Sequence, residues 1–428
     1  MNADSHADAI LAADPARIER ALEDIARRSL PGAGITRWGY SQLEREAHEL
    51  FAAHFRALGL ECRTDAAGNT IATLPGTDPA LAHLGTGSHL DSVPHGGRFD
   101  GIAGSVAAME VARMLVHAGI RPRRSIRFVA FATEEGARFG QACLGSRMIA
   151  GLTSAEDLDA LEDRDGVTAA DALRGVGLDP ACVHEARWHP GEVEAFIELH
   201  IEQGGILAAS KTPIGVVDVI SGSTRLAIDL TGTASHTGGT PMYQRADALA
   251  AAAAVVLTAE RVANDNRHRG TRISVGKIDV EPGSITTIPG FCRVYVDVRD
   301  VDPRRQRDTA NEVISAAHSI AQERGVGVTA KLLADTSPVT LPLAVQRHIV
   351  DAAASMGLGY RVMPSGASHD TQMIDRVCRG GMVFVPSLNG GVSHAPDEYS
   401  LATDIARGTD VLVRALLSID AASESGWM

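Results

Sequence analysis

The sequence predicts an α/β protein with a mixed, mostly parallel sheet, helices on both of its faces, and an inserted α+β domain. Helix and strand patterns alternate along the first half of the chain, which is typical of a parallel sheet. From about residue 213 the strands come in pairs separated by long helices, and the earlier alternation resumes near residue 337. At 428 residues the chain is too long for one comfortable core, so two domains are expected.

The first domain opens with amphipathic helices, whose apolar residues recur at three- to four-residue spacing. Short apolar segments alternate with the helices and are expected to form strands. We assign the first part of this domain to residues 1–212. The expected helices are 15–28, 40–58 and 102–117, and the expected strands are near 69–74, 81–90, 125–133 and 193–200.

The inserted domain, assigned to residues 213–336, is expected to combine one sheet with two helices. Its strands are expected at 214–220, 224–231, 271–280, 291–299 and 327–334, and its helices at 245–264 and 303–324. Residues 338–342 resemble a linker that returns the chain to the first domain, whose second part we assign to 337–428. That part is expected to contain helices at 344–356 and 404–419 and a strand at 382–386.

Bulk composition excludes several classes of protein. A net charge of −13 without a basic stripe argues against a nucleic-acid partner. No apolar segment approaches the ~20 residues that a membrane span needs, and the amino-terminal region does not resemble a signal peptide. Five scattered cysteines without a CxxC motif are typical of reduced thiols, so a cytoplasmic location is expected.

Metal-binding residue types follow three of the expected strands. His89 and Asp91 end one strand, Glu134 and Glu135 follow another, and His200 ends a third. The carboxyl ends of parallel strands meet at one edge of the sheet, where ligands bind in open α/β folds. Each residue alone is more often a hydrogen-bonded surface group, but several clusters at equivalent positions favour a site. His394 adds another imidazole in a loop after the strand 382–386.

The inventory suits two metal ions better than one. Three imidazoles and two carboxylates exceed the three protein ligands of a usual catalytic zinc, but they suit two ions ~3.5–4 Å apart if one carboxylate bridges. These candidate ligands are His89, Asp100, Glu135, His200 and His394. Asp100 is the expected bridge because the glycine-rich turn around it permits close backbone approach.

Two acidic residues near these ligands are expected to have other roles. Asp91 can accept the second N–H of His89 and so fix its tautomer. Neighbouring strand residues point in opposite directions, so Glu134 and Glu135 should differ in role. Glu134 therefore remains available as a general base on water.

With these residues in place, the chain resembles the M20-type amidohydrolases of the hydantoinase/carbamoylase group almost from end to end. This group includes N-carbamoyl-L-amino-acid hydrolases, allantoate amidohydrolases and ureidoglycolate amidohydrolases. The motifs that carry the resemblance are GSHLDSVPHGGRFDG at 87–101, EEGARF at 134–139, ELHIEQG at 198–204, HTGGTPM at 236–242, SGASHD at 365–370 and VPSLNGGVSHAPDE at 385–398.

The resemblance implies a division of labour among these residues. His89 and His200 would hold one divalent ion (zinc, manganese, cobalt or nickel), Glu135 and His394 a second, and Asp100 would bridge the two. Catalysis would involve Glu134 as the base, supported by Asp91. The inserted domain would serve for homodimerisation or as a lid, and His236 on it would stabilise the oxyanion of the reaction.

The resemblance also implies residues that bind the substrate. Arg299, in the segment VDVRD, would hold a substrate carboxylate, and Gln203 would contact its ureido or amide group. Gly366 and Ala367 are expected to line the same site. Two positions depart from the pattern of the group: Thr286 replaces an asparagine and Ser368 replaces a glycine. Threonine offers one hydroxyl where an amide offers two donors and an acceptor, so the substrate tail can differ.

These features predict hydrolysis of a linear amide or ureido C–N bond in a small carboxylate-bearing molecule. The leading expectation is an N-carbamoyl-L-amino acid or a related ureido acid such as allantoate. An N-acyl amino acid amidohydrolase or a dipeptidase on the same scaffold is the alternative among enzymes. A ligand-binding module would be expected to have lost ligands, and an oxidoreductase would need a GxGxxG turn early in the chain, which is absent.

Overall fold

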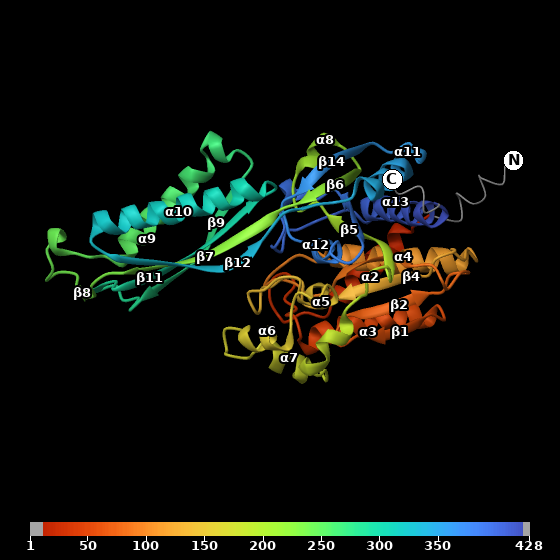
Figure 1. The fold of residues 1–428 in the computed structure, drawn as a ribbon, viewed down its shortest axis with the longest axis horizontal. Coiled ribbons are helices and arrows are strands. Elements are labelled where there is room, and N and C mark those ends of the chain that lie inside the picture. The colour runs from red at the N-terminus through yellow and green to blue at the C-terminus, as the bar shows by residue number, and fades with distance from the viewer. Residues whose placement is uncertain (1–11, 423–428) are drawn as a thin grey trace. The chain divides into compact units, whose positions relative to one another are not determined.

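The chain folds into two compact units, each with its own hydrophobic core (Figure 1). The structure, a computed structural model, describes residues 12–422. One unit consists of the chain up to Asp218 together with the chain from Leu341 onward. The other unit consists of Val219–Thr340.

The first unit is built on a nine-stranded sheet in the order β1-β2-β4-β3-β5-β15-β6-β13, with β14 also paired to β6. The four central strands β4, β3, β5 and β15 are parallel, and the outer pairs β1–β2, β2–β4, β15–β6 and β6–β13 are antiparallel. This confirms the predicted mixed, mostly parallel centre. The strands are β1 (Glu61–Thr64), β2 (Thr70–Leu74), β3 (His83–His89), β4 (Ile126–Phe131), β5 (Val193–Ile201), β6 (Ile214–Ile220), β13 (Val339–Thr340), β14 (Tyr360–Ser365) and β15 (Arg379–Val385).

Helices cover this sheet, and the most deeply buried of them is α4. It is apolar around nearly its whole circumference, as expected of a helix enclosed on all sides. Helices α2 and α3 are amphipathic and begin at Asp14 and Ser41, whose side chains accept backbone N–H bonds. The longer helices are α2 (Pro15–Ala26), α3 (Gln42–Ala57), α4 (Ile102–His117), α11 (Leu343–Ser355) and α13 (Ala402–Ala421).

Several short elements of this unit were not predicted. The strands β1 and β14 are mostly exposed, and β13 forms within the segment 338–342 that was predicted to be a linker. Short helices lack the repeated apolar spacing on which a prediction from sequence depends. These are α5 (Leu144–Ile149), α6 (Ala155–Ala160), α7 (Ala169–Gly175), α8 (Ile206–Ser210) and α12 (Asp370–Ile374).

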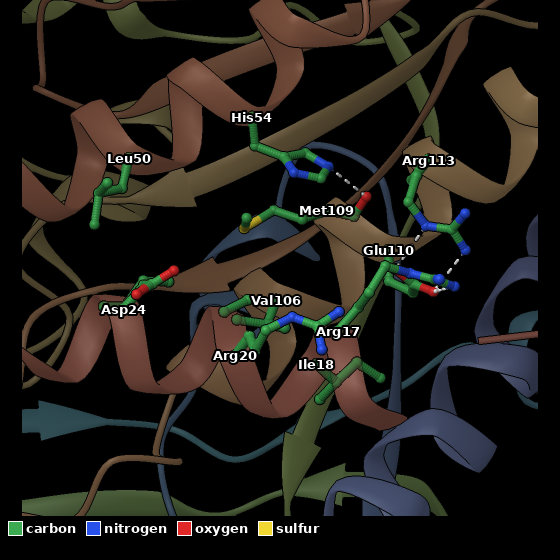
Figure 2. A pocket seen from close by; sticks show the side chains of 12 residues that line it. Arg17, Ile18, Arg20, Asp24, Leu50, His54, Val106, Met109, Glu110 and Arg113 are labelled. Atoms are coloured by element: carbon green, nitrogen blue, oxygen red, sulfur yellow. Dashed lines mark hydrogen bonds and ion pairs between the residues drawn. The ribbon is translucent and has the colours of Figure 1, made fainter. Parts of the chain in front are cut away.

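A hollow of about 260 Å³ lies among α2, α3 and α4 (Figure 2). Arg17 and Arg113 converge on the carboxylate of Glu110, and His54 contacts the carbonyl of Met109, as Figure 2 shows. These contacts join α2 and α3 to the buried helix. None of the predicted site residues lines the hollow, so we attribute its polar contacts to helix packing.

The second unit contains a four-stranded antiparallel sheet in the order β12-β7-β11-β9, with two helices packed against it. Alternate residues of β11 are buried, so one face of the sheet meets the helices. A separate two-stranded ribbon pairs β8 (Ser235–His236) with β10 (Thr287–Ile288). The sheet strands are β7 (Gly222–Thr231), β9 (Arg272–Glu281), β11 (Phe291–Asp300) and β12 (Gly327–Thr336), and the helices are α9 (Ala248–Ala263) and α10 (Pro303–Arg324).

No helix between residues 12 and 422 is both long enough and apolar enough to cross a bilayer.

Candidate metal centre and active site

Three neighbouring parallel strands bring the predicted histidines and glutamates to one edge of the sheet. His89 is the last residue of β3, and His200 is the penultimate residue of β5. Strand β4 ends at Phe131, and the chain then turns to Glu134 and Glu135. Because β3 is parallel to both β4 and β5, the carboxyl ends of all three strands meet at this edge.

Asp100 lies at the centre of the predicted ligand set. Its Oδ1 is 3.1 Å from Nε2 of His200 and 3.6 Å from Nε2 of His89. Its Oδ2 is 3.1 Å from Nε2 of His394, which in turn lies 3.4 Å from Oε2 of Glu135. The two oxygens of one carboxylate therefore face two different groups of donors.

A glycine makes this approach possible. Gly101 has φ +68°, a conformation that L side chains rarely adopt, and a Cβ there would overlap the ring of His89. The glycine-rich turn between β3 and α4 therefore allows the Asp100 backbone to lie against the histidine. The sequence analysis expected this close backbone approach from the glycine-rich turn around Asp100.

The imidazole rings are oriented by contacts on their far sides. Nδ1 of His200 is 2.9 Å from the carbonyl oxygen of Ile201, and Nδ1 of His89 is 3.3 Å from both the carbonyl and the carboxylate of Asp91. A ring nitrogen that donates to such an acceptor leaves the other nitrogen free to act as a ligand. In both rings Nε2 is thus turned toward Asp100.

The side chain of Asp91 also binds the backbone of both glutamates. Its Oδ1 accepts a hydrogen bond from the N–H of Glu134 at 2.9 Å, and its Oδ2 accepts one from the N–H of Glu135 at 3.0 Å. Asp91 therefore has the contacts of a residue that positions the backbone of Glu134 and Glu135.

Glu134 and Glu135 point to different partners, although they lie in the turn after β4 and not in the strand from which the sequence predicted their different roles. Oε2 of Glu134 is 3.9 Å from Nε2 of His89, and its Oε1 accepts a hydrogen bond from the thiol of Cys143 at 3.1 Å. Glu135 faces His394, and its Oε1 is buried without a hydrogen-bond partner. A buried carboxylate oxygen without a partner is expensive, so this atom is suited to a cation.

Burial and charge act in opposite directions on the ionisation of this cluster. Burial disfavours the charged form of Asp100, but hydrogen bonds with His200, His394 and His89 hold its pKa well below the ordinary value. Burial and then the neighbouring Asp100 charge raise the pKa of Glu135 well above its usual range. Burial lowers and the Asp100 and Glu135 carboxylates raise the pKa of His394, with a net value of about 10. These opposed shifts arise because the imidazoles and carboxylates lie within a few ångströms of one another in a buried cluster.

The five predicted ligands form two groups whose ligand atoms lie within 4.8 Å of one another. One group is His89, Asp100 and His200, and the other is Asp100, Glu135 and His394. Nitrogen and oxygen donors of this kind fit zinc, manganese or cobalt. Asp100, which the two groups share, is the residue predicted to bridge two ions.

A third cluster of possible donors, Glu198 with His200 and His369, has a different character. Oε1 of Glu198 accepts the hydroxyl of Ser88 at 2.7 Å, and its Oε2 accepts both the N–H and the hydroxyl of Thr371. Both carboxylate oxygens of Glu198 are therefore already engaged by protein donors. Glu198 thus connects Ser88 and Thr371 beside His200.

Gln203 lies directly beside Asp100. Its Nε2 donates to Oδ2 of Asp100 at 2.7 Å and to Oγ of Ser393 at 3.2 Å. A carboxylate accepts only, so this contact fixes which end of the amide carries the nitrogen. The other end, Oε1, is buried without a partner. It is an acceptor available to a donor from outside the chain.

The segment with Gly366 and Ala367 is connected to His200 through Ser365 and His369. Oγ of Ser365 lies within hydrogen-bond distance of both the N–H and the carbonyl of Ala367, at 3.1 and 3.0 Å, and 2.8 Å from Nε2 of His369. The His369 ring packs edge-on against that of His200, with 4.5 Å between centroids. Ser368, which replaces the glycine typical of the group, is half-buried.

The remaining predicted residues lie on the Val219–Thr340 unit. His236 pairs with Thr287 in the ribbon, so Thr286 is its close neighbour. Gly238 and Gly239 donate their backbone N–H groups to Nδ1 of His236 at 3.0 and 3.1 Å. The neutral ring then carries its proton on Nε2, which is therefore a donor.

Arg299 lies at the other end of the same unit. It follows Phe291 by eight residues along β11 and pairs with Ser223, whereas the ribbon precedes β11. Eight residues of extended strand span about 27 Å. Figure 1 shows β8 near one end of this sheet. His236 and Thr286 are thus brought together, and Arg299 is separated from both.

Three buried residues beside the predicted ligands escaped the sequence analysis: Cys143, Glu198 and Glu398. Cys143 contacts Glu134, and Glu398 accepts the backbone N–H of Asp100 at 3.0 Å. Glu198 lies in the motif ELHIEQG, and Glu398 lies in the motif VPSLNGGVSHAPDE. Their position in those motifs, as acidic residues without an assigned role, is the signal that could have identified them.

Comparisons with known proteins identify the family of this chain. Residues 85–418 match the model of "Peptidase family M20/M25/M40". An N-carbamoyl-L-amino-acid amidohydrolase of Paenarthrobacter aurescens is 38% identical over 404 residues, covering 94% of this chain and 98% of the relative. An allantoate amidohydrolase of Escherichia coli is 32% identical over 396 residues, covering 91% and 94%.

Solved structures give the same result. A crystal structure of an amidase of the hydantoinase/carbamoylase family from Burkholderia vietnamiensis matches with a TM-score of 0.90 at 32% identity. The match covers 96% of this chain and 98% of the other. As its motifs predicted, the chain belongs to peptidase family M20/M25/M40, and its relatives and structural neighbours include carbamoyl and ureido amidohydrolases.

Proposed function

We propose that this chain hydrolyses the linear ureido C–N bond of a small carboxylate-bearing molecule, with an N-carbamoyl-L-amino acid as the leading substrate. The products would be the amino acid, ammonia and carbon dioxide. The single observation that carries the proposal is the position of Asp100, whose two oxygens face separate sets of imidazole and carboxylate donors. The names of the relatives support the ureido bond as the target.

Two divalent ions fit the donor set. His89 and His200 would hold one ion with Oδ1 of Asp100, and Glu135 and His394 would hold the other with Oδ2. The unpartnered Oε1 of Glu135 favours this reading. When bound, such ions lower the pKa of a coordinated water and polarise the substrate carbonyl.

Glu134 is the proposed general base. It borders the ligand set without belonging to either group of ligand atoms, and the Cys143 thiol holds one of its oxygens. Its free oxygen can take a proton from the attacking water and return that proton to the leaving nitrogen. Burial raises the pKa of Glu134, which favours this return of the proton.

The proposed substrate contacts follow from hydrogen-bond capacity. Oε1 of Gln203 would accept an N–H of the ureido group, since it has no other donor. His236 would donate from Nε2 to the developing oxyanion. Arg299 would hold the substrate carboxylate as a planar pair of hydrogen bonds.

The separation of His236 and Arg299 supports a homodimer. A small substrate cannot reach across about 27 Å of strand, so both residues can serve one site only if two chains contribute. We therefore infer that the Val219–Thr340 unit takes part in dimerisation, with His236 supplied by one chain and Arg299 by its partner.

The substrate class is tested with metal-depleted protein reloaded with zinc, manganese or cobalt. Ammonia and amine release would be measured from N-carbamoyl-L-amino acids, allantoate, ureidoglycolate, N-acyl amino acids and dipeptides. The proposal expects ammonia from a ureido substrate. Cleavage confined to N-acyl amino acids or dipeptides would contradict it.

A further inference from the structure

We propose that Glu398 is a positioning residue that couples the loop bearing Asp100 to the loop bearing His394. The proposal rests on the two-metal function above, and it concerns how the second ion site is held in place. Glu398 is 4% exposed, and it lies far from Asp100 in sequence. It belongs to neither group of ligand atoms.

The first contact of Glu398 fixes the backbone at the bridge. Its Oε1 accepts the N–H of Phe99 at 3.1 Å and the N–H of Asp100 at 3.0 Å. Two consecutive backbone amides on one carboxylate oxygen leave the Asp100 main chain little freedom. A Cβ at Gly97 would overlap the Glu398 side chain, which explains the glycine at that point of the turn.

The second contact fixes the loop of His394. Oε2 of Glu398 accepts the hydroxyl of Ser393 at 2.6 Å. Ser393 precedes His394, whose side chain is half-exposed and whose φ is +57°. A half-exposed ligand in a left-handed conformation has little packing to hold it, so the hydrogen bond on its neighbour matters more.

The direction of the hydrogen bonds requires an acceptor at position 398. Gln203 donates a hydrogen bond to Oγ of Ser393, and the hydroxyl of Ser393 donates one to Oε2 of Glu398. A glutamine at 398 could still accept the two backbone amides through its carbonyl oxygen. Its amide nitrogen would instead donate to Oγ of Ser393, and the hydroxyl proton would turn toward Oδ2 of Asp100, 3.4 Å away. Glu398→Gln therefore reverses the loop contact and makes the hydroxyl compete with the second ion for Oδ2 of Asp100.

The proposal predicts an effect on one ion more than the other. Residues that orient metal ligands typically change metal affinity by about 10- to 100-fold when altered. In Glu398→Gln the ion on the side of Glu135 and His394 should bind about tenfold or more weakly, while the ion on the side of His89 and His200 is retained. Ser393→Ala should reproduce this pattern. Glu398→Ala should weaken both ions, because it also releases the Asp100 backbone.

Asp420 offers a matched control. Its carboxylate is also buried, and it accepts two consecutive backbone amides, those of Arg123 and Arg124, each at 2.7 Å. It contacts none of the predicted ligands through these bonds. Asp420→Asn should lower the melting temperature while both manganese affinities stay at the wild-type values.

The experiment is a titration of metal-free full-length protein with Mn²⁺, followed by calorimetry and by elemental analysis. Wild type is expected to bind two ions per chain in two resolvable steps. In Glu398→Gln and Ser393→Ala the affinity of only one step should fall. Unchanged binding in both variants, or equal weakening of both steps in both variants, would overturn the proposal. Should wild type itself bind fewer than two ions, the proposed function fails first, and the inference fails with it.

Discussion

The carboxylate of Asp91 accepts a hydrogen bond from the backbone N–H of Glu134 at 2.9 Å. Its other oxygen accepts the N–H of Glu135, and its side chain also lies 3.3 Å from Nδ1 of His89. One aspartate thus connects the strand that ends in a predicted metal ligand to the turn that carries the predicted base. The carboxyl ends of β3 and β4 are joined at this residue.

This arrangement predicts a large effect for Asp91→Ala. Loss of three contacts should lower kcat by about 10- to 100-fold and weaken metal binding, as expected when the partners of ligands are removed. Steady-state kinetics and metal content per chain measure the two effects. Asp91→Asn, which keeps one acceptor oxygen, should lie between the alanine variant and wild type. If the alanine variant kept wild-type kinetics and metal content, the positioning role would be wrong.

Glu134→Gln should separate chemistry from metal binding. The amide cannot take a proton from water, and a general base contributes about 10²- to 10⁴-fold, so kcat should fall by that amount. Metal content should remain near that of wild type because Glu134 is outside both ligand groups. Glu135→Gln is the matched control, since it should lose metal as well. Retention of most activity in Glu134→Gln would remove this residue from the role of base.

The two-chain site can be tested by mixing inactive variants. His236→Ala and Arg299→Ala should each lose activity as homodimers. If one chain supplies His236 and its partner Arg299, subunit exchange should restore about one quarter of wild-type activity, because half of the dimers are mixed and each has one intact site. Activity after exchange would be compared with that of the unmixed variants. No recovery despite proven exchange would show that each site draws both residues from one chain.

The stability of the catalytic unit should depend on pH through Asp65. Its carboxylate accepts N–H groups from Ala67 and Asn69, but burial dominates and raises the pKa of Asp65 to about 6 from 3.8. A pKa raised by folding means that the folded chain binds the proton more tightly. The associated stability is fully present below pH 3.8 and is lost as the pH rises through 6.

Asp65→Asn removes this titration. The difference in melting temperature between wild type and Asp65→Asn should therefore favour wild type most near pH 4 and shrink toward pH 7. Calorimetry on metal-free protein measures it, since metal loss at low pH would otherwise contribute. A difference that stays constant from pH 4 to pH 7 would contradict the assignment.

Much of the site could be predicted from sequence because parallel strands impose it. Once His89, Glu135 and His200 are placed after neighbouring strands, topology alone brings them to one edge of the sheet. The turn before α4 identified Asp100 for a similar local reason. Long helices such as α4 and α10 were also predicted with their observed ends, because periodic apolar patterns extend over many residues.

The residues that were missed act through contacts between distant segments. Glu398 meets Asp100 only because two loops converge, and no spacing along the chain encodes that meeting. Cys143 reaches Glu134 from the far end of a turn, with its backbone at φ +61°. The acceptor oxygen of Gln203 becomes informative only when its lack of a partner is visible in three dimensions.

The central claim is that two ions sharing Asp100 drive hydrolysis of a ureido bond. The most direct measurement is ammonia release from an N-carbamoyl-L-amino acid while metal-free protein is titrated with Mn²⁺. The account predicts negligible activity without metal, a rise that saturates at two ions per chain, and no rise in Asp100→Ala. Full activity without metal, or saturation at a single ion per chain, would contradict it.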